Sequence, residues 1–410
     1  MKQMGAIPPG YAADGGGMLL IGGERAEDLV TRAGRTPAFV YDLALVRARV
    51  ARLRAAMPPA LRLHYAMKAN PLPAVVAALV SETDGIDIAS VGEMRIALAA
   101  RARHISFAGP GKQDHEIQAA IEMGVTLNLE SEGEAKRAVA IAERLGITPK
   151  LAVRVNPDFD LKGSGMRMGG GAKPFGVDAA RVPALVQLIR AAGADWRGFH
   201  IFAGSQALDA AAIAETQANT ITLAAELAKA AGAPPPLVNI GGGLGVPYFP
   251  GDAAVDVAFV GERLNATLTN RSEILRDTVF AMELGRYLVA EAGVYLTRIL
   301  DRKVSHGEVF LVTDGGLHHQ LAASGNFGTV VRRNYPVAIA TRYGAPGEEV
   351  QSVVGCLCTP LDKLGDQILL PRGDVGDLVA LFMAGAYGAT ASPQAFLGHP
   401  PAAELVVNEQ

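Results

Sequence analysis

Residues 61–88 of the chain read LRLHYAMKANPLPAVVAALVSETDGIDI. Their pattern predicts a strand over 61–67, a helix that Pro71 opens over 71–81, and a second strand over 85–88. Two strands separated by a helix pair in parallel, because a parallel connection needs a long crossover. The stretch therefore predicts one strand–helix unit of an α/β fold.

The same alternation continues to about residue 284. Eight such units over roughly 240 residues have the size of a (β/α)8 barrel, or TIM barrel, in which helices surround a closed parallel sheet. A doubly wound open sheet is the alternative that the pattern leaves open. The other strands are predicted at 105–108, 126–129, 151–155, 198–202, 237–240 and 279–283, with helices that include 93–101, 132–145 and 211–231.

The character of the sequence changes after Leu284. Short apolar runs joined by Gly, Pro and Asp predict a second, antiparallel β domain that forms a barrel or a sandwich. We expect residues 38–42 to add a strand to it. The expected strands are 310–313, 337–340, 350–354, 367–370 and 377–383, and the predicted domains are an N-terminal segment over 1–42, the barrel over 43–284 and the β domain over 285–410.

Composition limits the class of protein. Of the 410 residues, 19% are charged, below the usual share of about 25%, which suits a large core or a buried subunit interface. The formal net charge of −3 predicts neither a nucleic-acid nor a membrane partner. The chain has only two cysteines, which predict a reducing, cytoplasmic setting, and no apolar run approaches the ~20 residues that a bilayer span needs.

Candidate catalytic groups stand where a barrel would present them. In a (β/α)8 barrel these groups come from the C-terminal ends of the strands and from the loops that follow. Each such residue alone is more often part of a core or a turn, but several at one rim favour a site. They are Lys68, Asp87, Arg154, His200, Gly241, Gly242, Gly243 and Glu283.

Two of these features indicate a particular chemistry. Lys68 ends an apolar strand and is placed for partial burial, which lowers the pKa of an amine and makes it a Schiff-base nucleophile; a snorkelling lysine is the alternative. Gly241, Gly242 and Gly243 let backbone N–H groups approach an anion, so they predict a phosphate site, with a plain tight turn as the alternative. The dinucleotide-binding pattern fails because Val246 replaces its last glycine.

Other chemistries have little support. No serine stands in a G-x-S-x-G pattern. His318 and His319 are adjacent, so on a strand they point to opposite faces and do not readily share a metal ion. Cys356 and Cys358 have no second ligand pair at the spacing of a zinc site. We therefore predict no metal site.

These residues resemble the motifs of the fold-type III pyridoxal-phosphate decarboxylases, which include diaminopimelate, ornithine and arginine decarboxylases. The resemblance covers nearly the whole chain and extends most closely to the exosortase-associated members, found in exopolysaccharide loci. The matching segments are YAMKAN (65–70), DIAS (87–90) with Glu93, Gly109 with Lys112, RVNP (154–157), Phe175 with Gly176, HIFAGSQ (200–206), the glycine run, ELGR (283–286), GCLC (355–358) with Asp362, and GAY (385–387).

The resemblance implies pyridoxal 5'-phosphate as cofactor and gives roles to single residues. Lys68 would hold the cofactor through a Schiff base, Glu283 would pair with its pyridine nitrogen, and His200 would stack on its ring. Cys358 would protonate the carbanion across the interface of a homodimer with shared sites. The other implied cofactor-binding residues are Asp87, Arg154, Ser205, Gly241, Gly242, Gly243, Arg286 and Tyr387; of these, Ser205, the three glycines, Arg286 and Tyr387 would hold the phosphate.

The chain departs from this family where the substrate would bind. Members carry Glu or Asp directly after the catalytic cysteine, facing the distal amine of the substrate, but Thr359 stands there and cannot supply that charge. The substrate is therefore expected to be an unusual amino acid, or one attached to a carrier. The expected substrate-binding residues are Thr359, Asp362, Arg333 and Tyr387, with Arg332 as an alternative to Arg333.

Two alternatives to a decarboxylase remain. Racemases of this fold use a tyrosine as second base, whereas this chain has Cys358 in the context typical of a decarboxylase. A catalytically silent regulatory homologue would be expected to lose Lys68, His200 or Cys358, and all three are present. The glycine-rich segment 163–171 is interpreted as a mobile active-site loop.

Overall fold

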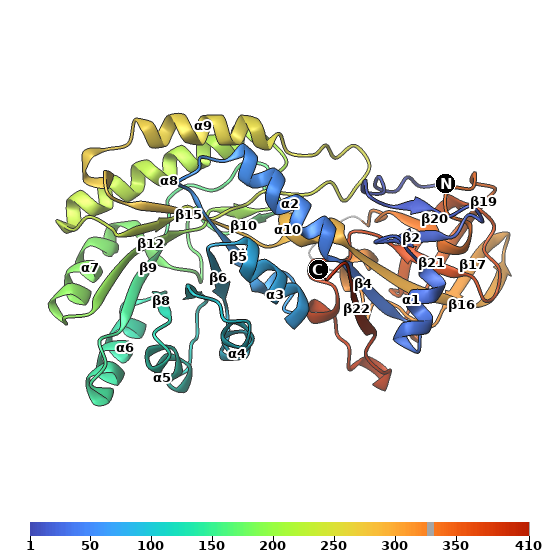
Figure 1. Ribbon diagram of the computed structural model, residues 1–410, viewed down its shortest axis with the longest axis horizontal. Coiled ribbons are helices and arrows are strands. Elements are labelled where there is room, and N and C mark those ends of the chain that lie inside the picture. The colour runs from blue at the N-terminus through green and yellow to red at the C-terminus, as the bar shows by residue number, and fades with distance from the viewer. Residues whose placement is uncertain (326–331, 410) are drawn as a thin grey trace. The chain divides into compact units, whose positions relative to one another are not determined.

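The computed structural model describes residues 1–325 and 332–409, which divide into two compact units (Figure 1). None of the described helices has both the length and the apolar character that a membrane span requires. The domain limits predicted from the sequence stay predictions. The barrel unit consists of Val50–Val246 with Ala254–Tyr287, and the β unit of Met1–Arg49, Pro247–Ala253 and Leu288–Gln410.

A closed sheet of eight parallel strands forms the centre of the barrel unit. Each strand pairs with the next one along the chain, and the last strand pairs back with the first. This closure confirms the (β/α)8 prediction and excludes the open sheet. The strands are β5 (Arg62–Ala66), β6 (Gly85–Ile88), β7 (Ile105–Phe107), β8 (Thr126–Leu129), β9 (Lys150–Asn156), β12 (Asp195–Ile201), β14 (Leu237–Asn239) and β15 (Val279–Leu284).

Seven helices connect consecutive strands of the barrel and lie outside it (Figure 1). Side-chain oxygens of Ser90, Ser131 and Asp209 cap three of them by accepting backbone N–H bonds in the first turn. The first helix begins at Pro73 and not at Pro71 as expected. The helices are α3 (Pro73–Glu82), α4 (Val91–Ala99), α5 (Asp114–Glu122), α6 (Glu132–Leu145), α7 (Val182–Ala191), α8 (Ala210–Ala231) and α9 (Val257–Thr269).

The β unit is built on a mixed sheet of eight described strands. Its path runs β18-β21-β16-β17-β19-β20, and β4 pairs with both β16 and β22. The longest strand, β16, lies outside the strands predicted from the sequence. The strands are β4 (Ala38–Asp42), β16 (Gly293–Ser305), β17 (Glu308–Thr313), β18 (Val337–Ile339), β19 (Glu349–Val354), β20 (Lys363–Leu370), β21 (Leu378–Leu381) and β22 (Ala403–Val407).

The predicted antiparallel β domain is antiparallel in most of its strand pairs, but two pairs are parallel. β17 and β19 are parallel, and so are β4 and β22. Neither pair is joined by a hairpin: β18 comes between β17 and β19 in the chain, and β4 and β22 lie near opposite ends of the sequence. Only strands joined by a short turn must be antiparallel, so turn signals could not reveal these pairings.

Shorter elements complete the two units. In the barrel unit, β11 pairs with β9, and β10 pairs with β13. In the β unit, β1, β2 and β3 form a small sheet of their own. These elements are β1 (Ala12–Ala13), β2 (Leu19–Ile21), β3 (Glu24–Arg25), α1 (Ala26–Ala33), α2 (Leu43–Ala56), β10 (Met166–Arg167), β11 (Val177–Asp178), β13 (Gly204–Ser205) and α10 (Arg286–Val289).

Candidate active site

Lys68 lies just beyond the C-terminal end of β5. The strand ends at Ala66, and Lys68 is the central residue of the 3-10 turn Met67–Ala69, whose other two side chains are buried. The Lys68 side chain is exposed, and its Nζ lies 5.7 Å from the ring centroid of Phe202. The expected partial burial is therefore wrong, because the lysine stands in the turn after the strand and not within it.

The end of β15 packs directly against this turn. A Cβ at Gly285 would lie 2.8 Å from Cβ of Ala69 and 2.9 Å from the carbonyl oxygen of Ala66. Only glycine permits so close an approach of the two backbones. The packing brings Arg286, the first residue of α10, to the same end of the barrel as Lys68.

Glu283 is the centre of a buried hydrogen-bonded cluster. Its Oε2 lies 2.8 Å from Nε2 of His200 and accepts a 3.2 Å bond from Nδ2 of Asn239. Burial acts to raise the pKa of Glu283, but His200, with Lys68 and Arg154, outweighs it and holds this pKa well below its usual value. Glu283 is therefore a carboxylate. Nδ1 of His200 is buried and has no partner among the described residues.

Asn239 was not predicted as a site residue. Besides its bond to Glu283, its Oδ1 accepts a 2.9 Å bond from the backbone N–H of Gly241. It therefore ties the buried carboxylate to the glycine loop that follows β14. A buried amide in an otherwise apolar strand was the signal in the sequence, because such a group needs partners.

Asp87 is buried at the end of β6, where it faces His64 of β5. Nδ1 of His64 lies 3.4 Å from Oδ2 of Asp87. Burial opposes the charged form of His64, yet the Asp87 carboxylate, with a smaller contribution from Glu283, raises the pKa of this imidazole. Asp87 and Glu283 therefore both interact electrostatically with His64.

Arg154 of β9 is held by a carboxylate that the sequence analysis missed. Its Nη1 donates a 2.9 Å bond to Oε1 of Glu130, and its guanidinium lies 4.9 Å from the ring centroid of Phe175. Glu130 also accepts backbone N–H bonds from Gly109 and Gly176. Because Glu130 follows β8, the rule that selected the other rim residues would have found it.

The three glycines form a loop after β14 whose backbone carries no side chains of its own. A Cβ at Gly242 would lie 1.9 Å from the Glu283 carbonyl oxygen, and Gly241 and Gly243 have φ of +70° and +85°. The loop is joined to Ser205 and its neighbours, since the N–H of Ala207 donates to the carbonyl of Gly243. Among the described residues, no acceptor takes the N–H of Gly242 or of Gly243. This arrangement favours an anion site over a plain turn.

The glycine-rich segment 163–171 lies against residues 203–206, and the next residue, Ala207, bonds to the glycine loop. Met166 pairs with Ser205, and the N–H groups of Met168 and Gly169 both donate to the carbonyl of Ala203. Gly165 donates to the carbonyl of Gln206. The segment therefore contacts the residues around Ser205, while its part in an active site and its mobility stay predictions.

Cys358 and Thr359 belong to the β unit, in the loop between β19 and β20. The Cys358 thiol is free and exposed, and Thr359 is half-buried. Asp362, in contrast, is buried and accepts the N–H groups of Leu317 at 2.6 Å and Leu357 at 2.9 Å. Burial raises its pKa, while these two bonds act to lower it. Asp362 thus holds the loop, and its expected contact with substrate has no support in this geometry.

The two arginines that the sequence left as alternatives differ in their contacts. The Arg332 guanidinium donates to the backbone carbonyls of Ser324 and Lys363, so it is used within the fold. Arg333 is half exposed, its Nη1 lies 4.0 Å from Oδ1 of Asp252, and its guanidinium stacks on the Phe249 ring at 3.8 Å from the centroid. Tyr387 has a φ of +53°, a left-handed conformation that is uncommon for any residue other than glycine.

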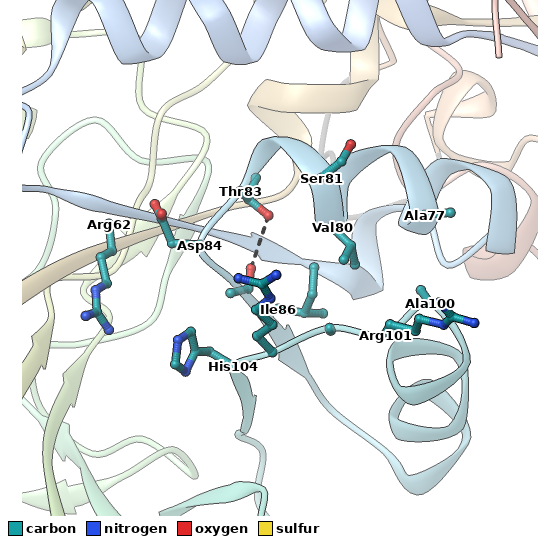
Figure 2. Close-up of a pocket in the computed structure, with 13 residues that line it drawn as sticks. Arg62, Ala77, Val80, Ser81, Thr83, Asp84, Ile86, Ala100, Arg101 and His104 are labelled. Atoms are coloured by element: carbon teal, nitrogen blue, oxygen red, sulfur yellow. Dashed lines mark hydrogen bonds between the residues drawn. The ribbon is translucent and has the colours of Figure 1, made fainter. Parts of the chain in front are cut away.

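A large hollow lies at the other end of the barrel. It has a volume of about 620 Å³ and is bordered by residues before or at the start of β5, β6 and β7, such as Arg62, Asp84 and His104, and by the end of α3 (Figure 2). None of the sequence-predicted site residues lines it. Volume alone therefore does not locate the site.

The C-terminal end of the barrel combines groups of complementary chemistry. It presents an exposed primary amine, an ionised carboxylate bonded to an imidazole, an arginine in a buried ion pair, and backbone N–H groups in a glycine loop. The amine can hold an aromatic ligand through a covalent bond, and the carboxylate can keep a proton on that ligand. The N–H groups of the glycine loop can bind a phosphate group of the same ligand.

Comparison with known proteins agrees with this chemistry. A family model described as "Pyridoxal-dependent decarboxylase, pyridoxal binding domain" matches residues 43–290. The L-glutamyl-[BtrI acyl-carrier protein] decarboxylase of Niallia circulans is 35% identical over 389 residues, 92% of this chain and 90% of the relative. A diaminopimelate decarboxylase of Archaeoglobus fulgidus is 30% identical over 400 residues, 96% of this chain and 92% of the relative.

Solved structures resemble both units. Diaminopimelate decarboxylase of Helicobacter pylori, in complex with L-lysine, superposes with a TM-score of 0.81 at 26% identity, covering 94% of each chain. The corresponding enzyme of M. jannaschii shares the fold, with a TM-score of 0.85, covering 97% of this chain and 92% of that one.

Proposed function

Because the chain belongs to the family of pyridoxal-dependent decarboxylases, we propose that it removes CO2 from an amino acid that presents no free distal ammonium group, such as a glutamyl group attached to a carrier protein. The chain is a pyridoxal phosphate-dependent carboxy-lyase. The identity of its substrate and the roles of single residues are the parts that we propose.

The residues at the C-terminal end of the barrel fit the cofactor. The Lys68 amine is exposed, Nδ1 of His200 is buried without a described partner, and the glycine loop offers two N–H groups that no described acceptor takes. Lys68 would bind the cofactor carbon, and Gly242 and Gly243 would bind the phosphate. The remaining phosphate ligands in this proposal are Ser205, Gly241, Arg286 and Tyr387.

Bound pyridoxal phosphate supplies an aromatic ring that accepts the electron pair left when CO2 departs. Glu283, as a carboxylate, would keep a proton at the ring nitrogen. His200, which is hydrogen-bonded to Glu283, would lie against the ring face. Asp87 and Arg154 would complete the charges around the ring, each from a buried position.

Cys358 would return the proton to the substrate carbon after CO2 has left. Its thiol is free and exposed, as a proton donor that must reach a substrate requires. We propose that it acts on the site of a second subunit in a homodimer. Two free cysteines also support a cytoplasmic location.

The substrate proposal depends on the loop after Cys358. Thr359 is neutral, and the carboxylate of Asp362 is buried and bound to backbone N–H groups of its own unit. This loop therefore offers no carboxylate to a distal ammonium group. Arg333, half exposed, is the residue that we assign to a carboxylate or acyl group at the distal end of the substrate. The carrier-linked substrate named for the Niallia relative supports this choice.

The experiment measures CO2 release by the purified chain reconstituted with pyridoxal phosphate. The substrates are diaminopimelate, lysine, ornithine, arginine, free glutamate and a glutamyl–carrier-protein conjugate. We expect release from the conjugate to exceed release from each diamino acid. Faster release from diaminopimelate, lysine or ornithine would falsify the substrate proposal. Racemisation without CO2 release, or a protein with no visible absorption band of bound cofactor, would contradict the activity itself.

A further inference from the structure

His318, Cys356 and His399 come together in the β unit. They lie after β17, after β19 and ahead of β22, so they are far apart in the chain. One ligand atom of each lies within 4.8 Å of those of the other two, and Sγ of Cys356 is 3.9 Å from Nε2 of His399. The rings of His318 and His399 have centroids 5.1 Å apart. None of these residues has a part in the proposed decarboxylation.

His318 is the most informative member of this cluster. Its side chain is fully buried, yet neither ring nitrogen has a hydrogen-bond partner among the described residues. Buried polar groups in proteins are nearly always paired, so an imidazole left unpaired needs an explanation. A bound ion that accepts its lone pair provides one.

The neighbouring His319 shows that the environment can satisfy a histidine. Its Nδ1 lies 3.1 Å from the Tyr295 hydroxyl and its Nε2 lies 2.9 Å from the carbonyl oxygen of Pro400. The second contact fixes the backbone next to His399. His319 is therefore a positioning residue that holds His399 beside Cys356, while His318 faces the cluster.

We propose that His318, Cys356 and His399 bind a zinc-class divalent ion. Two imidazole nitrogens and one thiolate are ligands that zinc prefers, and hard cations such as Mg²⁺ and Ca²⁺ prefer oxygen. The Cys356 thiol donates a 3.5 Å bond to the carbonyl oxygen of Asp314, and coordination would release its proton to solvent. Zinc bonds of about 2.0–2.3 Å place ligand atoms about 3.3–3.6 Å apart. The present separations are wider, and side-chain rotation of the half-buried Cys356 and His399 would close them. A water molecule would take the fourth position.

The ion would connect two segments of the β unit. Cys356 precedes Cys358 by two residues, and His399 stands shortly before the C-terminal strand. Coordination would therefore join the C-terminal segment to the loop that carries Cys358, and would leave the Cys358 thiol uncoordinated. This assignment does not depend on the substrate or the activity.

The experiment titrates the metal-stripped full chain with Co²⁺, a spectroscopic stand-in for zinc. We expect one ion per chain, with visible bands of a tetrahedral site and a near-ultraviolet thiolate-to-cobalt band. Cys356→Ser and His399→Ala should each weaken binding by more than about tenfold, since losing even an outer partner of a ligand costs that much. Both residues are half-buried, so these variants avoid the folding risk of changing His318.

Two matched variants test the ligand assignment. Cys358→Ser and His115→Ala remove the other thiol and an exposed histidine outside the cluster, and both should bind Co²⁺ as the unmodified chain does. Absence of stoichiometric Co²⁺ binding would overturn the proposal. Binding by the Cys356→Ser and His399→Ala variants that is as tight as binding by the unmodified chain would also overturn it. Loss of the thiolate band in Cys358→Ser would show that the wrong cysteine was assigned. The readout requires neither pyridoxal phosphate nor turnover, so its failure is separate from failure of the proposed function.

Discussion

The two ends of the barrel differ in how they use charged side chains. At the C-terminal end, Glu283 and Arg154 are buried and bonded to His200 and Glu130. At the N-terminal end, Arg101 and His104 are exposed, and Asp84 bonds Arg54 and the backbone of Leu63. The N-terminal end nevertheless contains the hollow of about 620 Å³.

The two ends therefore differ in burial and in shared hydrogen bonds, and these properties, more than volume, support the proposal that the C-terminal end is the catalytic one. Charged groups held in a dry environment keep their orientation and act more strongly on a bound molecule than exposed groups do. Exposed groups around a hollow remain solvated, so replacing one of them should have little effect on a bound molecule. The comparison predicts large effects from substitutions at the C-terminal end and small ones elsewhere.

The largest effect is expected for Lys68→Ala. Removing the amine should abolish the visible band of bound pyridoxal phosphate and lower CO2 release by a factor of about 10⁴ or more, as the loss of a covalent catalyst does in other enzymes. Arg101→Ala, at the border of the hollow, should leave both unchanged. Comparable losses of CO2 release in Lys68→Ala and Arg101→Ala would contradict the proposed difference between the two ends of the barrel.

Glu283→Gln should have the next largest effect. A neutral amide no longer keeps a proton at the ring nitrogen, so kcat should fall by about 10²–10³. The Lys68-bound cofactor and its visible band should persist, which separates an electronic effect from lost binding. Glu82→Gln, at the end of α3, serves as the control. Unchanged kcat in Glu283→Gln would disprove the assigned role.

Glu130→Gln tests stability at the same end. Removing one partner of a buried ion pair leaves Arg154 uncompensated, so the free energy of unfolding should fall by about 3 kcal/mol. Glu132→Gln changes a carboxylate only two residues away, which pairs with Arg181 at the surface, and should cost less than about 1 kcal/mol. Urea unfolding of the two variants measures the difference, and equal costs would contradict the burial argument.

The smallest effect is the pH dependence of the Glu130 contribution. Burial acts to raise the pKa of Glu130, but Arg154, Lys112 and the N–H of Gly176 lower it below the ordinary value of 4.5. A carboxyl group whose pKa is lowered by folding stabilises the fold above its unfolded pKa and loses that contribution as the pH falls through the folded value. The difference in unfolding free energy between the unmodified chain and Glu130→Gln should therefore be complete at about pH 7 and shrink below about pH 4.5. A constant difference across this range would show that the charge is not its origin.

Local patterns were sufficient for the barrel and for most residues at its rim. Hydrophobic periodicity predicted all eight strands of the barrel, and Lys68, His200 and Glu283 lie at the C-terminal end as expected. These predictions succeeded because each strand–helix unit is formed by residues close in sequence. The sequence left partial burial and an exposed, snorkelling amine open for Lys68, and the turn of three residues after the strand determines its exposure.

Contacts between distant segments could not be predicted. The parallel pairing of β17 with β19 depends on the path of the chain between them. Glu130 and Asn239 acquire roles only through partners on other strands. The bonds that the Asp362 carboxylate accepts from the N–H groups of Leu317 and Leu357 could not be predicted either.

The order of strands and helices in the barrel, the lysine and the glycine loop were predictable from the sequence, because they depend on periodicity and on the chemistry of neighbouring residues. The tertiary structure decided which polar side chains meet. Arg154 bonds to Glu130 and His200 bonds to Glu283 because strand pairing brings these side chains together. Cys356 lies beside His399 because of loop packing. Side-chain direction and burial are properties of the folded chain, and no local pattern specifies them.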